Sequence, residues 1–175
     1  TELTVGAVRR LPAPNRELVL IAAPIKDGVE QIVQKATELG VTRIKLVTAK
    51  RSPPRLARLD RLRRVIVGAC EQSGRAWLPD LHEVQPFESA VRETAEPARL
   101  IASLTPSPTS LATDPCDTSF AVGPEGGWTE TEERFAERHD FERIHFGPLT
   151  LRATTAAVAG LTLIRANWGW RAPAV

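Results

Sequence analysis

Residues 18–23 read Leu-Val-Leu-Ile-Ala-Ala, an uninterrupted apolar run of strand length that ends at Pro24. A strand with one face in water alternates apolar and polar residues, whereas a strand covered on both faces is apolar throughout. The run therefore predicts a strand inside a parallel sheet that is covered on both sides.

The segments that follow alternate between helix and strand patterns. Val29, Ile32, Val33 and Ala36 recur at helical spacing, and Gly40 stands where such a helix would end. The other expected elements are strands over 42–46, 100–104, 119–122 and 144–146, and helices over 55–71, 129–139 and 155–168. Strands that alternate with helices predict an α/β domain with a mainly parallel sheet and helices on both faces.

The composition is that of one globular domain. Of the 175 residues, 42% are hydrophobic and 25% are charged, which is enough apolar material for one core. We expect the main domain over 15–175, with residues 1–14 as a linker or the last strand of an upstream domain. No apolar run of about 18 residues and no signal pattern occurs, so a cytoplasmic protein without a membrane span is expected. Cys70 and Cys116 lack the spacing of a metal site or a disulfide framework, and no metal is expected.

Basic residues are concentrated in one part of the chain. Between Arg43 and Arg75 there are ten lysines and arginines against two acids. The apolar residues of the expected helix over 55–71 form one stripe, and most of its arginines lie outside that stripe. Arginine suits phosphate and stacks on bases, so a polyanion partner is favoured, with an ordinary solvated helix face as the alternative. The arginines expected to contact such a polyanion are Arg51, Arg55, Arg58 and Arg61.

Three loops follow expected strands, over 104–110, 123–128 and 147–152. In parallel α/β sheets, ligands bind at the carboxyl ends of strands. The second loop reads Gly-Pro-Glu-Gly-Gly-Trp and leads into a helix that opens with the capping-box pair Thr129 and Glu132. Its glycines allow close backbone approach to a ligand, although a plain structural turn is the alternative and the spacing is not that of a dinucleotide-binding loop.

Several motifs resemble one known family. VGPEGGWTETEERF (122–135) and FGPLTLRATTA (146–156) are similar to the paired signature of the ribosomal RNA small subunit methyltransferase E family. QKATELGVTRI (34–44), the turn at 50–52 and ACEQSGRAWLP (69–79) resemble further blocks of that family, in the same order. These bacterial enzymes methylate N3 of a uridine in 16S ribosomal RNA and belong to the SPOUT superfamily. The resemblance implies S-adenosylmethionine as methyl donor, a homodimer with active sites at its interface, and a deep trefoil knot near the C-terminus.

The resemblance also assigns roles to residues by position. Cofactor-binding roles fall on Leu104, Thr105, Gly123, Glu125, Gly126, Gly127, Gly147, Leu151 and Thr155. Catalytic roles fall on Glu71, Arg75 and Arg152, and RNA contacts on Gln72 and Arg75. For Glu71 the alternative is a solvated charge near a helix end. Leu149 and Thr154 stand where the family usually has an arginine and a glutamate.

Methylation at uridine N3 requires loss of a proton and in-line attack on a sulfonium methyl group, so alignment and electrostatic stabilisation matter most. Arg75 or Arg152 could stabilise the uracil anion. The histidines at 82, 139 and 145 are scattered, and none is assigned as a general base. The alternatives are a SPOUT enzyme acting on transfer RNA and a non-catalytic RNA-binding paralogue. The helix over 155–168 is apolar nearly all round, which predicts a dimer interface.

Overall fold

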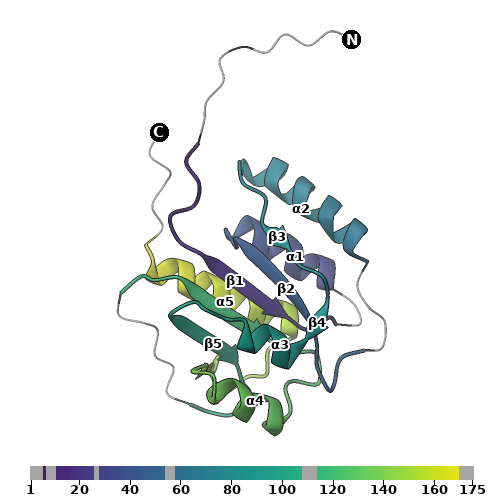
Figure 1. Cartoon of the computed structure of the whole chain (residues 1–175), viewed down its shortest axis with the longest axis vertical. Helices are drawn as coiled ribbons and strands as arrows, with labels where there is room; N and C mark the ends of the chain where they lie inside the picture. The colour runs from purple at the N-terminus through teal and green to yellow at the C-terminus, as the bar shows by residue number, and fades with distance from the viewer. Residues whose placement is uncertain (1–5, 7–10, 26–27, 54–57, 108–113, 170–175) are drawn as a thin grey trace.

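The computed structural model describes residues 6, 11–25, 28–53, 58–107 and 114–169. These residues form a sheet between two layers of helices (Figure 1). The strands are β1 (Leu18–Ala22), β2 (Arg43–Thr48), β3 (Asp80–Leu81), β4 (Gln85–Pro86), β5 (Ala98–Ala102), β6 (Thr118–Val122) and β7 (Glu142–Ile144). The helices are α1 (Val29–Glu38), α2 (Leu59–Ser73), α3 (Phe87–Arg92), α4 (Glu130–Glu137) and α5 (Ala153–Asn167).

Strand β1 lies in the middle of the sheet. The strand order is β3-β2-β1-β6-β5-β7, with β4 paired to β2, and every pairing among the described strands is parallel. Each residue of β1 and of β6 is buried. The strand predicted from the apolar run is therefore confirmed, and so is the mainly parallel α/β fold.

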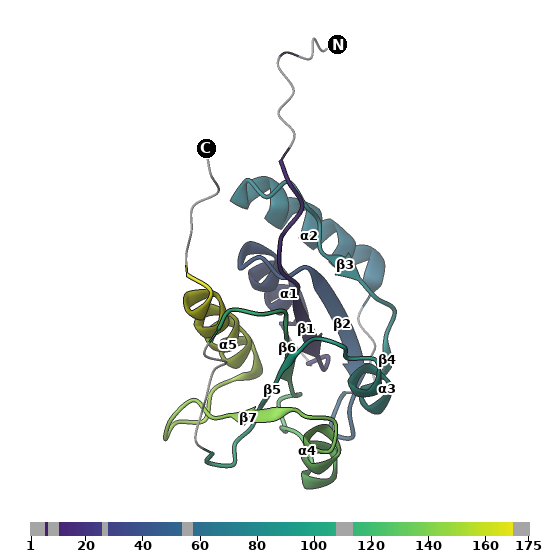
Figure 2. The ribbon, with the colours of Figure 1, turned by 60° about the vertical axis from the view of Figure 1, so that its left-hand side comes forward.

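Helices cover both faces of the sheet, as predicted. Helices α1, α2 and α5 lie on one face, and α3 and α4 lie on the other (Figure 1, Figure 2). Successive residues of β1 point to opposite faces, so that Leu18 and Leu20 join the first core while Val19 and Ile21 join the second. The uninterrupted apolar run supplies both cores at once.

Helix α5 approaches β6 through small residues. Its buried residues are Ala153, Ala156, Ala157, Gly160, Leu161 and Ile164. A Cβ atom at Gly160 would lie 2.2 Å from the ring of Phe120, so only glycine permits this approach. The other side of the helix exposes Thr155, Leu163 and Ala166. One side of this helix is therefore exposed in a single chain, although its composition predicts burial all round.

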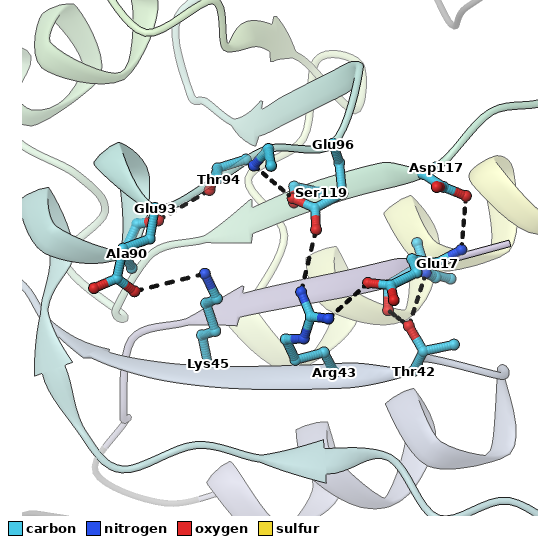
Figure 3. Close-up of polar contacts among 12 residues, drawn as sticks. Glu17, Thr42, Arg43, Lys45, Ala90, Glu93, Thr94, Glu96, Asp117 and Ser119 are labelled. Carbon is cyan, nitrogen blue, oxygen red and sulfur yellow. Dashed lines mark hydrogen bonds and ion pairs between the residues drawn. The ribbon is translucent and has the colours of Figure 1, made fainter.

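A network of charged groups crosses the α3 side of the sheet near the amino ends of its strands (Figure 3). Arg43 lies between two carboxylates, with its Nη2 2.9 Å from Glu17 Oε2 and its Nη1 3.4 Å from Glu96 Oε1. The hydroxyl of Ser119 donates a hydrogen bond of 2.7 Å to the buried Glu96. The network thus joins β2 and β6 to the segment that precedes β5.

The predicted elements are observed with shifted ends. Helix α2 covers 59–73 rather than 55–71, and residues 54–57 lie outside the described residues. Residues 1–5 and 7–10, part of the expected linker or upstream strand, also lie outside them. Helix α3 and the two-residue strands β3 and β4 are not predicted, because they are too short to show a period. Among the described helices, none combines the length and the apolar character needed to cross a membrane.

Candidate functional site

Three loops meet at the carboxyl edge of the sheet and surround a hollow, at the edge where the sequence predicts a ligand site. The walls come from residues 102–104 at the end of β5, from 122–125, Gly127 and Trp128 at the end of β6, from 145–146 and 149–151 after β7, and from Ala153 and Ala156 of α5. Most of these side chains are apolar, while Ser103, Glu125 and His145 add polar groups. Such a wall suits a ligand with a flat apolar part and a few polar groups.

The residues expected to bind a cofactor divide into two groups. Those on the wall of the hollow are Leu104, Gly123, Glu125, Gly127 and Leu151. Those not on the wall are Thr105, Gly126, Gly147 and Thr155. In the second group, the Thr105 N–H donates to the hydroxyl of Ser103 at 3.0 Å, and Thr155 lies on the exposed side of α5. Direct contact with a ligand stays a prediction for both groups, of which only the first lies on the wall of this hollow.

The loop after β6 folds over a buried tryptophan. Trp128 stacks on Phe87 of α3 with ring centroids 4.2 Å apart. Its indole ring lies against Gly123, where a Cβ atom would come within 3.1 Å of it. Gly127 has a φ of +68°, a conformation that favours glycine, and its N–H donates to Pro124 O at 2.8 Å. The glycines therefore shape this loop as well as opening it to a ligand.

Helix α4 supports the loops through two consecutive buried acids, Glu132 and Glu133. The Glu132 carboxylate accepts the Thr129 N–H at 2.7 Å, which completes the predicted capping box, and accepts the Lys50 N–H at 2.7 Å. The Glu133 carboxylate accepts the hydroxyl of Ser103 at 2.7 Å. The loops after β2 and β5 are thus both attached to the helix that follows the loop after β6.

A second hollow adjoins the first, on the side of α1. Its own walls include Ile25, Gln31 and Arg152, and it shares Glu125 and Leu151 with the first hollow. Arg152 is exposed and precedes the first residue of α5. Arg152 therefore lies beside the first hollow rather than in it.

Arg75 lies at the opposite edge of the sheet. Its guanidinium donates to the carbonyl oxygens of Thr37 and Val41, between the last turn of α1 and the start of β2. Burial lowers the pKa of Arg75; the Cys70 thiol opposes this shift, and Arg165 adds to it. Glu71 and Gln72 are exposed at the end of α2. Within one chain these expected catalytic and RNA-binding residues do not meet the hollows, because α2 carries the chain from the carboxyl edge to the amino edge.

Two exposed arginines lie at the start of α2, and one of them contacts the first turn of α1. Arg58 and Arg61 are 73% and 62% exposed. Arg61 contacts Glu30, in the first turn of α1, with Nε 2.6 Å from Oε1, and Gln31 of the second hollow is the next residue. The hydrogen bond from Arg58 holds the pKa of Asp60 below its ordinary value. Arg55 lies outside the described residues, and Arg51 is turned toward the loop after β6, to which its Nη1 donates at Gly126 O.

The structure adds residues that sequence reasoning missed. Ser103, Trp128 and His145 all line the first hollow. His145 directly follows β7 at the carboxyl edge, so it is the one of the three histidines that lies on the wall of the first hollow. The sequence pattern predicts a strand over 144–146 that includes His145, whereas the observed strand ends at Ile144, so this position at a strand end was not predicted. No group of three or more potential metal-ligating side chains occurs among the described residues.

Comparison with known proteins identifies relatives of this chain. A ribosomal RNA small subunit methyltransferase E from Synechocystis is 32% identical over 173 residues, which cover 93% of this chain and 56% of that protein. The chain thus spans just over half the length of this curated relative.

Two solved structures have a similar fold. A ribosomal RNA small subunit methyltransferase E from Neisseria gonorrhoeae bound to S-adenosyl methionine superposes with a TM-score of 0.81 at 32% identity, over 88% of this chain and 67% of that one. A methyltransferase from Legionella pneumophila in complex with the same cofactor gives 0.79 at 32% identity, over 86% and 66%. The family model described as RNA methyltransferase domain matches residues 12–165, in agreement with the resemblance seen in the sequence motifs. The chain therefore belongs to the RNA methyltransferase domain family.

Proposed function

We propose that this chain is the catalytic domain of an S-adenosylmethionine-dependent methyltransferase that modifies N3 of a uridine in 16S ribosomal RNA. The observation that carries the proposal is the convergence of three loops, around 102–104, 122–128 and 145–151, on one largely apolar hollow. Its relatives named above, which include proteins bound to S-adenosyl methionine, support the choice of cofactor.

The residues of the first hollow fit this cofactor. Val122, Phe146 and Leu151 offer apolar walls to an adenine ring, and Gly127 leaves backbone open to polar atoms. The Glu125 carboxylate favours the positive charge of a sulfonium. When bound, the cofactor would supply an electrophilic methyl group, while the residues of this chain hold it and keep water away.

We assign the second hollow to the acceptor base. It shares Glu125 and Leu151 with the first, so a base bound there would lie next to the methyl donor. The Gln31 amide carries a donor and an acceptor that match the edge of a uracil. We assign to Arg152, which lines this hollow, the role of stabilising the negative charge that develops when N3 loses its proton.

RNA would reach this hollow across α2. Arg58 and Arg61 are exposed, and their contacts with Asp60 and Glu30 are surface ion pairs, which are weak enough for a phosphate to replace. Arg61 forms an ion pair with Glu30, which directly precedes Gln31 in the sequence. We therefore propose that RNA passes over Arg58 and Arg61 on its way to the base site.

The proposal includes the homodimer and the trefoil knot that the family resemblance implies. The exposed side of α5, with Thr155, Leu163 and Ala166, supports a partner subunit because a helix this apolar is costly to leave in water. Within one chain, Glu71, Gln72 and Arg75 lie far from both hollows. If they have the expected roles, they must therefore act at the site of a partner subunit in a dimer. A ribosomal substrate also supports a cytoplasmic location.

Two measurements on this chain test the proposal. Titration calorimetry with S-adenosylhomocysteine should give saturable heat. Methyl transfer to 16S RNA or small subunits, located by mass spectrometry, should fall at least tenfold in Arg152→Ala with little change in cofactor affinity. The control is Arg134→Ala, on the exposed side of α4. RNA binding without cofactor binding would instead identify a non-catalytic paralogue, and methylation of transfer RNA alone would assign the other substrate.

A further inference from the structure

We propose that Arg51 is a positioning residue that holds the loop after β6 in its cofactor-binding shape, and not an RNA contact. The identity of the ligand, S-adenosylmethionine, rests on the proposed function. The positioning role itself rests on the side-chain contacts of Arg51. It therefore revises the role expected from the charge pattern alone.

The guanidinium of Arg51 binds the back of that loop at two points. Its Nη1 donates to the carbonyl oxygen of Gly126 at 2.7 Å and to that of Trp128 at 3.2 Å. Hydrogen bonds from a permanently charged donor are stronger than neutral ones, and arginine can hold two acceptors in a fixed geometry. These two carbonyl groups flank Gly127, which lines the first hollow.

The aliphatic stem of Arg51 explains the glycine at 126. A Cβ atom added to Gly126 would lie 3.2 Å from Arg51 Cδ and 3.3 Å from Arg51 Cβ. Gly126 is not on the wall of the first hollow, so contact with the wall does not account for its lack of a side chain. A methyl group at 126 would instead meet Arg51 on the outer side of the loop and push it by a few tenths of an ångström.

Arg51 is itself held by a rigid turn. The Ala49 N–H donates to the Ser52 hydroxyl at 2.9 Å, and the Ser52 N–H donates back to Ala49 O at 3.0 Å. The Lys50 N–H donates to Glu132, whose carboxylate also completes the capping box of α4. The turn and the cofactor loop are thus fixed to the same carboxylate, which places the Arg51 side chain across the short gap between them.

The first test measures ligand affinity. In Arg51→Ala, the affinity for S-adenosylhomocysteine should fall about tenfold, the loss expected for two hydrogen bonds from a charged group at an exposed position. Arg51→Lys should recover part of it through one contact. The matched control, Arg134→Ala, removes another exposed arginine and should leave the affinity unchanged. RNA affinity should be the same in Arg51→Ala and Arg134→Ala. An Arg51→Ala protein that binds the ligand normally but loses RNA affinity would overturn the proposal in favour of a phosphate contact.

A second variant tests the contact with Gly126. Gly126→Ala should weaken ligand binding in the wild-type background and cost clearly less when combined with Arg51→Ala, because the stem that the new methyl group meets is gone. Strict additivity of the two effects would contradict the packing argument.

Hydrogen exchange separates this inference from the proposed function. Without any ligand, Arg51→Ala should speed exchange of the amides of residues 126–128, while Arg134→Ala should not. If the wild type fails to bind S-adenosylhomocysteine, the proposed function is wrong, but faster exchange in Arg51→Ala would still establish the positioning role. Unchanged exchange would reject that role whatever the ligand result.

Discussion

The hydroxyl of Ser103 donates a hydrogen bond of 2.7 Å to the buried carboxylate of Glu133, and this bond fastens the loop after β5 to helix α4. The same hydroxyl accepts the N–H of Thr105 at 3.0 Å. Ser103 therefore sets the first wall of the hollow at the carboxyl edge.

Ser103→Ala should lower the affinity for S-adenosylhomocysteine about three- to tenfold, because a buried carboxylate and a backbone N–H each lose a partner. Calorimetry measures the effect. Ser73→Ala is the control, since that hydroxyl donates to Ala69 O at the far end of α2. Equal affinity in the two variants would show that the Ser103 wall does not depend on this bond.

Gly160→Ala should destabilise the fold by about 1–3 kcal/mol or more, because the new methyl group would overlap the ring of Phe120. Gly68→Ala is a matched helix substitution with no heavy atom within 4 Å of the added Cβ, and it should stabilise by about 0.5–1 kcal/mol. Urea unfolding of both proteins gives the comparison. A neutral Gly160→Ala would mean that α5 can move away from β6 without cost.

Glu96→Ala should cost about 1–3 kcal/mol of stability, since Arg43 loses one of its two carboxylates and Ser119 loses its acceptor. Glu130→Ala removes a carboxylate from an exposed ion pair with Arg134 and should change stability by less than about 0.5 kcal/mol. Thermal or urea unfolding distinguishes them. If both variants lost a similarly small amount of stability, the network in Figure 3 would contribute no more than an exposed ion pair does.

Cys70 should resist alkylation in the native protein. Burial raises the pKa of its thiol, and the positive charge of Arg75 opposes this only in part. The folded state therefore favours the protonated thiol, and its stability should decline as pH rises through the alkaline range, where the unfolded chain ionises first. Iodoacetamide labelling of a Cys116→Ala variant across pH measures the effect. Labelling at neutral pH as fast as in urea would contradict it.

Arg58→Glu combined with Arg61→Glu should weaken RNA binding and reduce the slope of log affinity against log salt by about 1–2, because each phosphate contact releases counterions. Affinity for S-adenosylhomocysteine should stay the same. Arg134→Glu is the charge-matched control on another helix. An unchanged salt slope in the double variant would show that Arg58 and Arg61 do not contact RNA phosphates and only face solvent.

The sequence predicts this fold well because its decisive signals are local. The apolar run at 18–23 and the capping box at Thr129 depend only on neighbouring residues. The convergence of the three loops also follows, since parallel strands end at one edge. Whether a loop residue faces the hollow does not follow: Gly126 and Gly127 are adjacent, yet only Gly127 is on the wall.

Arg75 shows the other limit of sequence reasoning. Its motif resembles that of the family, but its place in the fold depends on the length of α2. At 15 residues, that helix spans about 22 Å and takes the chain to the far edge of the sheet. The direction of the Arg51 side chain also could not be predicted from the density of basic residues. It depends on a turn that is fixed by Glu132, which lies far along the chain.

The central position of β1 has a consequence for how the chain folds. Leu18 pairs with Thr118, so the two middle strands come from segments separated by most of the domain. Until residues 118–122 have been synthesised, β1 has β2 on one side and an unpaired apolar edge on the other. Such an edge is prone to pair with other chains, and closing so long a loop slows folding. We therefore expect nascent or truncated chains that end before β6 to aggregate, and the arrival of β6 to be the step that commits the domain to its native topology.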